Sequence, residues 1–242
     1  MRARDDPLSR ALLRIRRAVR RGRVAEALAV AEHYWQASRH DDSQGGVRCT
    51  VFIYYVFQKL ARCNVAALSA MERWLDDARA ALVGDARGDT MRAAEVACLT
   101  KVLDRPQVLF AVTEQQRGTP AMDRLARYNA EMFVAAQRYA LLVETGVCEP
   151  QYVRSHCESV REHFTSAEPR DAETVEIERE SEVDDVAVPF EALAGVGRDA
   201  DALALAALVL GQHDDAEVRA RLASAAARAG NPVLAWQVRD GV

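Results

Sequence analysis

The chain has 242 residues, of which 50% are hydrophobic, and its formal net charge is −4. This length and composition allow a sizeable hydrophobic core, and the 6% share of aromatic residues with only 12 glycines and 7 prolines favours helices over a turn-rich β architecture. The longest apolar runs, residues 51–57 and 202–210, are far shorter than the roughly 20 residues that span a bilayer. We therefore expect an all-α protein with no membrane partner.

The cysteines and the N-terminus indicate the cellular compartment. The five cysteines are an odd number and lie mostly within apolar helical patterns, which argues against a disulfide framework. The N-terminus carries arginines without the apolar stretch and small-residue cleavage site of a secretory signal. These features predict an intracellular protein, either cytoplasmic or nuclear.

The first predicted elements form a helical hairpin. A helix begins near Pro7, with apolar residues at helical spacing (Leu8, Leu12, Ile15 and Val19), and ends at Gly22. A second helix covers about 23–38. The following segment is ambiguous, because the β-branched and aromatic residues of Thr50–Phe57 suit a buried strand, whereas the length of 47–63 favours a buried helix.

Further helices are predicted along the rest of the chain. Asn64 caps a helix that runs to about Val83, and others cover 90–103, 106–116 and 149–164. The longest periodic run, 121–144, predicts one continuous helix as the spine of the core. Three short alanine-rich helices are expected at 199–211, 214–230 and 232–238.

An acidic segment separates the last three helices from the others. Residues 165–191 contain ten acids and two arginines, together with Pro169 and Pro189, which is typical of a flexible linker. The predicted architecture is therefore an irregular helical bundle, with a main domain at 1–164, a flexible acidic linker at 165–191 and a small C-terminal helical unit at 192–242.

Arginines crowd the N-terminal hairpin. Nine of the first 23 residues are arginine, and seven of them fall on one predicted surface: Arg10, Arg14, Arg17 and Arg21 at i, i+4, i+7 and i+11, with Arg16, Arg20 and Arg23 beside them. Such a row could follow a phosphate backbone or an acidic protein segment. Alternatively it is a solvated face that the acidic segment neutralises. No aromatic residue interleaves with these arginines, which disfavours stacking on single-stranded nucleic acid.

No catalytic motif accompanies this surface. Phosphate-binding loops and the common hydrolase motifs are absent, and the glycines at 195–200 suit a turn before a helix better than a dinucleotide site. Cys148, His156, Cys157 and His163 include zinc-ligand types, but their spacing is poor for zinc, so no metal or cofactor is predicted. The alternative is an enzyme whose site is assembled from distant residues, with His156, Cys157 and His163 the first candidates.

The segment LSRALLRIRRAVRRGRVAEALAVAEHYW resembles the opening hairpin of the C-terminal region of clamp-loader-like AAA+ proteins of the replication-associated recombination class (RarA/MgsA). The resemblance covers about an eighth of the chain and implies an oligomerisation or DNA-replication accessory domain without the ATPase module. Tetratricopeptide repeats contain similar segments, and ARAGNPVLAWQVRD fits the same pattern, but no fixed period repeats three times.

The sequence thus predicts a non-enzymatic helical interaction or assembly module. The arginines of its first hairpin would contact a polyanion, which could be either nucleic acid or an acidic protein segment. The protein could also form a homo-oligomer. A helical-repeat-like protein–protein adaptor and the enzyme described above remain the alternatives.

Overall fold

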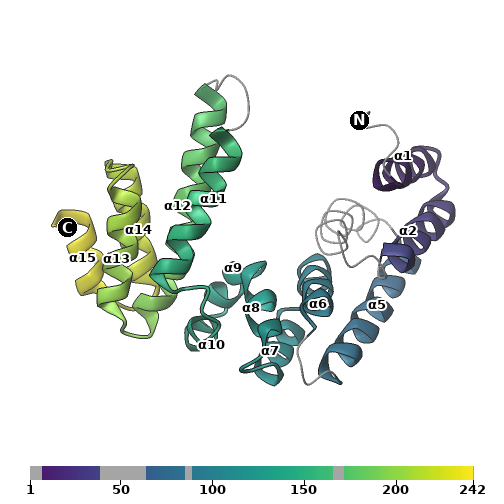
Figure 1. The fold of residues 1–242 in the computed structure, drawn as a ribbon, viewed down its shortest axis with the longest axis horizontal. Coiled ribbons are helices and arrows are strands. Elements are labelled where there is room, and N and C mark those ends of the chain that lie inside the picture. Colours follow the sequence, from purple (N-terminus) through teal and green to yellow (C-terminus); the bar gives the residue numbers. More distant parts are fainter. Residues whose placement is uncertain (1–6, 39–63, 85–88, 166–171, 242) are drawn as a thin grey trace. The chain divides into compact units, whose positions relative to one another are not determined.

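The computed structural model describes residues 7–38, 64–84, 89–165 and 172–241, and all regular elements within these ranges are α-helices (Figure 1). The all-α prediction is confirmed. The ambiguous segment Thr50–Phe57 lies outside the described residues. No helix within the described ranges is both long and apolar enough to cross a membrane.

The chain divides into two compact units, residues 1–128 and 129–242, which we call the first and second units. The described helices of the first unit are α1 (Pro7–Arg20), α2 (Val24–Ser38), α5 (Val65–Val83), α6 (Thr90–Leu103), α7 (Pro106–Gln115) and α8 (Pro120–Arg127). Those of the second unit are α9 (Ala130–Ala135), α10 (Tyr139–Glu144), α11 (Pro150–Thr165), α12 (Ala172–Gly195), α13 (Asp199–Leu210), α14 (Ala216–Arg228) and α15 (Pro232–Asp240). This division differs from the predicted boundaries at 164 and 191.

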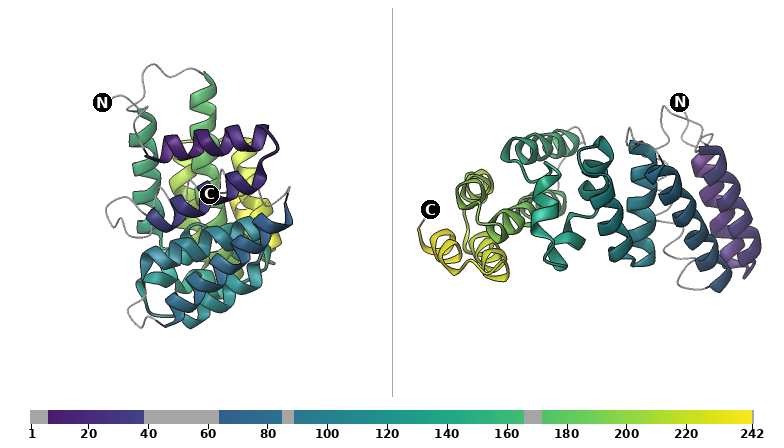
Figure 2. Two further views of the ribbon diagram at one scale, coloured as in Figure 1. Left: turned by 90° about the vertical axis from the view of Figure 1, so that its right-hand side faces the viewer. Right: turned by 90° about the horizontal axis from the view of Figure 1, so that it is seen from below.

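The predicted N-terminal hairpin is confirmed, with a shifted apolar face. Helices α1 and α2 lie side by side (Figure 2). From residue 10 onward, the buried residues of α1 are Ala11, Ile15 and Ala18, whereas Val19, which the predicted stripe included, is 41% exposed. Ala11 and Ala18 are buried against α2 because their small side chains allow the two helices to approach closely. In this orientation of α1, Val19 faces solvent.

The remaining described helices of the first unit pack around α6. Asn64 caps α5 as predicted, since its side-chain oxygen accepts hydrogen bonds from the backbone N–H groups of Ala66 at 2.9 Å and Ala67 at 3.2 Å. Helix α6 contacts α5, α7 and α8 and is buried along most of its length. It is therefore the centre of the core in this part of the first unit.

The prediction of one continuous helix at 121–144 is wrong. Three short helices, α8, α9 and α10, occupy this stretch, and the division between the two units falls after Tyr128. Gln137 adopts a left-handed conformation with φ 54°, and the backbone N–H of Arg138 donates to the carbonyl oxygen of Phe133 at 2.8 Å, which closes α9. Apolar residues at helical spacing continue through the breaks because each short helix buries its own side chains.

The prediction of a flexible acidic linker is wrong for residues 172–191, which belong to the 24-residue helix α12. Apolar residues interleave with the acids and are buried, among them Val183, Val186, Ala187, Phe190 and Leu193. The helix also contains Pro189, whose ring nitrogen cannot donate to the preceding turn. Helix α12 nevertheless packs against α11, α13 and α14, so burial of its apolar residues outweighs the proline and the charge density.

The three C-terminal helices are confirmed as α13, α14 and α15, but they belong to the larger second unit rather than to a separate one. One tight turn recurs within the described residues. A left-handed residue at Gly22, Asp104, Gln137, Gly197 or Gly230 is followed by a residue whose N–H bonds to the carbonyl five positions earlier, at 2.8–2.9 Å. Five connections between described helices thus share one turn geometry.

Gly195 allows α12 to approach α10 closely. A Cβ atom at this position would lie 2.2 Å from a ring carbon of the buried Tyr139. We therefore expect Gly195→Ala to lower the free energy of unfolding by about 1–3 kcal/mol, although alanine is the better helix former. Urea denaturation followed by circular dichroism measures this change.

Gly84→Ala is the matched control, since its Cβ would lie 3.4 Å from the nearest atom, the carbonyl oxygen of Ala80. Equal stability of the two variants would show that the close approach at Gly195 relaxes without cost.

Candidate functional site

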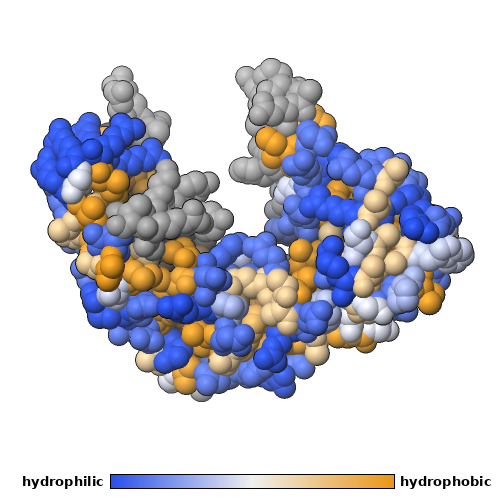
Figure 3. Space-filling model, turned by 180° about the vertical axis from the view of Figure 1, so that it is seen from behind, coloured by the Kyte–Doolittle hydropathy of each residue, from blue (hydrophilic) through white to orange (hydrophobic). Residues whose placement is uncertain are grey.

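The seven predicted arginines form one exposed surface on the N-terminal hairpin, which we call the arginine face. Its residues are all exposed: Arg10, Arg14, Arg16, Arg17, Arg20, Arg21 and Arg23. Figure 3 shows hydrophilic side chains over much of α1, at the upper left of that view. The buried residues Ala11, Ile15 and Ala18 lie on the opposite side of the helix and attach it to α2. The packing of the hairpin therefore turns the arginines outward, as the spacing predicts.

The arginine face has little neutralising charge within the described residues. Arg23 forms an ion pair with Glu26 at 3.0 Å, and the other six arginines form none with any described residue. Like charges three and four residues apart destabilise an isolated helix. Arg17 and Arg20 lie in the last turn of α1, where they interact favourably with the helix dipole, whereas Arg10 and Arg14 lie further from this end. A bound polyanion would relieve this repulsion.

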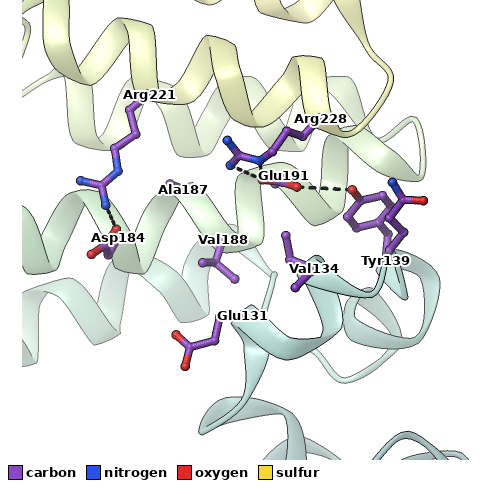
Figure 4. Close-up of a pocket in the computed structure, with 11 residues that line it drawn as sticks. Glu131, Val134, Tyr139, Asp184, Ala187, Val188, Glu191, Arg221 and Arg228 are labelled. Carbon is purple, nitrogen blue, oxygen red and sulfur yellow. Dashed lines mark hydrogen bonds and ion pairs between the residues drawn. The ribbon is translucent and has the colours of Figure 1, made fainter. Parts of the chain in front are cut away.

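A second candidate site is a groove of about 480 Å³ in the second unit, lined by residues of α9, α10, α12 and α14 (Figure 4). Its most buried polar group is the carboxylate of Glu191, which is 3% exposed. This carboxylate accepts a hydrogen bond from the Tyr139 hydroxyl at 3.3 Å and two from the Arg228 guanidinium at 3.0 and 2.5 Å. Asp184 pairs with Arg221 along the same groove.

These groups are structural rather than catalytic in their arrangement. Burial and the Glu191 carboxylate raise the pKa of Tyr139, so its phenol stays protonated and donates to Glu191. Both carboxylates already engage guanidinium groups, which join α12 to α14. Sequence reasoning missed these residues because Glu191 falls in the segment predicted to be a linker, and no local pattern links it to Tyr139 or Arg228.

Two of the three candidate catalytic residues, His156 and Cys157, are described, and they lie in different environments. The His156 side chain is exposed and lies 3.6 Å from Asp185, whereas the adjacent Cys157 is buried. Burial, with the nearby acids Asp185 and Glu182, raises the pKa of the Cys157 thiol to about 11. The side chain of His163 lies outside the described residues. No group of three or more possible metal ligands occurs within the described ranges.

Comparison with known proteins adds no relative: no protein family, no curated protein and no solved structure matches the chain. The resemblance of the first hairpin to the replication-associated recombination class therefore stays an expectation from its residues alone.

Cysteine reactivity tests the enzyme alternative. The raised pKa of Cys157 leaves its nucleophilic thiolate scarce at pH 8, about a hundredfold below that of a thiol with an ordinary pKa near 9. We expect iodoacetamide to leave Cys157 unmodified in the native protein and to alkylate it after unfolding in urea. Peptide mapping by mass spectrometry resolves each cysteine, and rapid native alkylation of Cys157 would revive the enzyme hypothesis.

Proposed function

We propose that this protein is a non-enzymatic helical interaction module that binds a polyanion through the arginine face. One observation carries the proposal: six exposed arginines on one helical hairpin have no ion-pair partner among the described residues. Such a surface attracts polyanions electrostatically, and release of their condensed counterions supplies binding free energy. The resemblance of the hairpin would make the protein an accessory of DNA replication or repair.

The length of the row favours duplex nucleic acid. Arg10 and Arg21 are eleven residues apart on or just after α1, which corresponds to about 16 Å along the helix axis. This span matches about five phosphates of one strand at 3.4 Å of axial rise each. The described hairpin presents no aromatic residue between the arginines for stacking on unpaired bases. This surface therefore suits contact with the phosphate backbone of a duplex, independent of base sequence.

The acids of α12 are engaged within the second unit. Glu182 interacts with Arg161 and His213, Asp184 with Arg221, and Glu191 with Arg228. Glu176 pairs with Arg179, and Asp185 lies 3.6 Å from His156. Much of the negative charge that could have neutralised the arginine face thus has its own counter-charges. This supports an external polyanion over an intramolecular one.

A protein–protein adaptor is the second candidate. The recurring left-handed turn, with 33 residues between Asp104 and Gln137 and again between Gly197 and Gly230, is typical of proteins built from helical hairpins. On this alternative the arginine face would dock an acidic protein segment rather than a nucleic acid.

A charge-neutralised triple variant tests the nucleic-acid proposal. Replacing Arg14, Arg17 and Arg21 with glutamine keeps long side chains with similar helix propensity and removes three phosphate contacts. We expect weaker binding to duplex DNA of any sequence, and a log–log salt dependence less steep by about 0.9 for each lost contact. Fluorescence anisotropy across a salt series measures both.

The matched control removes three other exposed arginines, Arg73, Arg79 and Arg154, with the same change in net charge. Its salt slope should equal that of the unmodified protein. Equal slopes for all three proteins would contradict the proposal, and binding of an acidic peptide but not DNA would favour the adaptor.

A further inference from the structure

One exposed row along α14 consists of small side chains. Ala216, Ala220, Ser224 and Ala227 follow one another at helical spacing and are all exposed, while the opposite face is buried in the second unit. Charged residues normally occupy the most exposed line of a surface helix. An exposed row of alanines leaves no solvating group there, and it allows another helix to approach closely.

Helix α15 places a large apolar side chain beside this row. Trp236 lies in the lining of the groove described below and is 60% exposed. A groove of about 420 Å³ runs between the two helices, with Ala220, Ala223, Ser224 and Ala227 from α14 and Pro232, Ala235, Trp236 and Arg239 from α15. An exposed tryptophan at the wall of an alanine-lined groove has the composition of an interaction hot spot rather than of an ordinary protein surface.

We propose that the α14–α15 hairpin is a homodimer interface in which two copies form a four-helix bundle. The helices of the hairpin are antiparallel neighbours. A two-fold axis parallel to the helices places α15 of each copy over α14 of the other, so that every pair of neighbours is antiparallel, as in up-and-down bundles. The partner is therefore a second copy of this chain.

The shape of the hairpin is self-complementary in this arrangement. Trp236 lines the groove together with Ala223 and Ser224. Rotation about an axis parallel to the helices keeps each residue at its own level, so the indole of one copy meets the small side chains of the other. Each copy supplies one protruding tryptophan and receives one, which buries both rings in a single symmetric contact.

The charges at the edge of the groove also favour a second copy. Arg239 lines the groove near Ala220, which is one helical turn from Glu217 on α14. The side chains of Arg239 and Glu217 are 63% and 79% exposed, and within one copy Arg239 pairs with the adjacent Asp240 at 3.1 Å and Glu217 with Arg179 at 3.3 Å. Exposed ion pairs contribute little free energy, so both side chains can exchange these partners for one another across the interface. The same rotation brings Arg239 of one copy toward Glu217 of the other, and symmetry repeats this pairing of opposite charges.

Sedimentation velocity of the full chain tests the interface. Because a single hairpin face is small, we expect a concentration-dependent dimer with a dissociation constant of about 1–100 μM. Trp236→Ala should weaken the dimer about tenfold or more, and Ala220→Arg should abolish it while preserving helix propensity. Val65→Ala, which trims an exposed apolar residue of α5 in the first unit, should leave it unchanged.

A charge exchange provides the second measurement. Glu217→Arg and Arg239→Glu should each weaken the dimer, and the double exchange should restore it. A monomer throughout the concentration range, or an Ala220→Arg variant that dimerises like the unmodified protein, would overturn the proposal. Thermal melts by circular dichroism verify folding, and none of these substitutions alters the arginine face.

Discussion

The second unit depends on the acidic helix α12 being held by basic side chains from its neighbours. Glu182 and Glu191 are almost fully buried, and a buried carboxylate is expensive to leave without a partner. Arg161 and His213 meet Glu182, and Arg228 meets Glu191, so the surrounding helices supply the compensation. The same contacts determine where α11, α13 and α14 lie against α12. Removal of one of these basic partners would leave a buried carboxylate uncompensated, which is strongly destabilising.

The arginines of the second unit have a different role from those of the first hairpin. The arginines of the second unit, such as Arg161 and Arg228, are half-buried or paired with carboxylates and contribute to the fold. The seven arginines of the arginine face are exposed, and six of them form no ion pair with a described residue. Arginine therefore has two roles in one chain: it compensates buried carboxylates in the second unit, and it leaves a positive surface on the first hairpin. The proposed function follows from the second role.

The two proposed surfaces differ in their physical basis. The arginine face attracts a ligand through long-range charge, which salt screens. The α14–α15 hairpin presents an alanine row and an exposed tryptophan, whose association would depend on apolar burial and shape. They lie in different units of the chain, so each can be altered by substitution without changing the other. A dimer formed through the second unit would carry two arginine faces.

Local patterns in the sequence determined the helical class, the cap at Asn64, the first hairpin and the outward arginines, because spacing and capping act within a few residues of each other. Only the tertiary structure decided that residues 172–191 are a packed helix and that 121–144 breaks into three. Arg161 and Arg228 meet the acids of α12 from positions 21 and 37 residues away, and Tyr139 meets Glu191 from 52 residues away. A local pattern shows a surplus of acids there, whereas the distant partners that neutralise them are set by the fold.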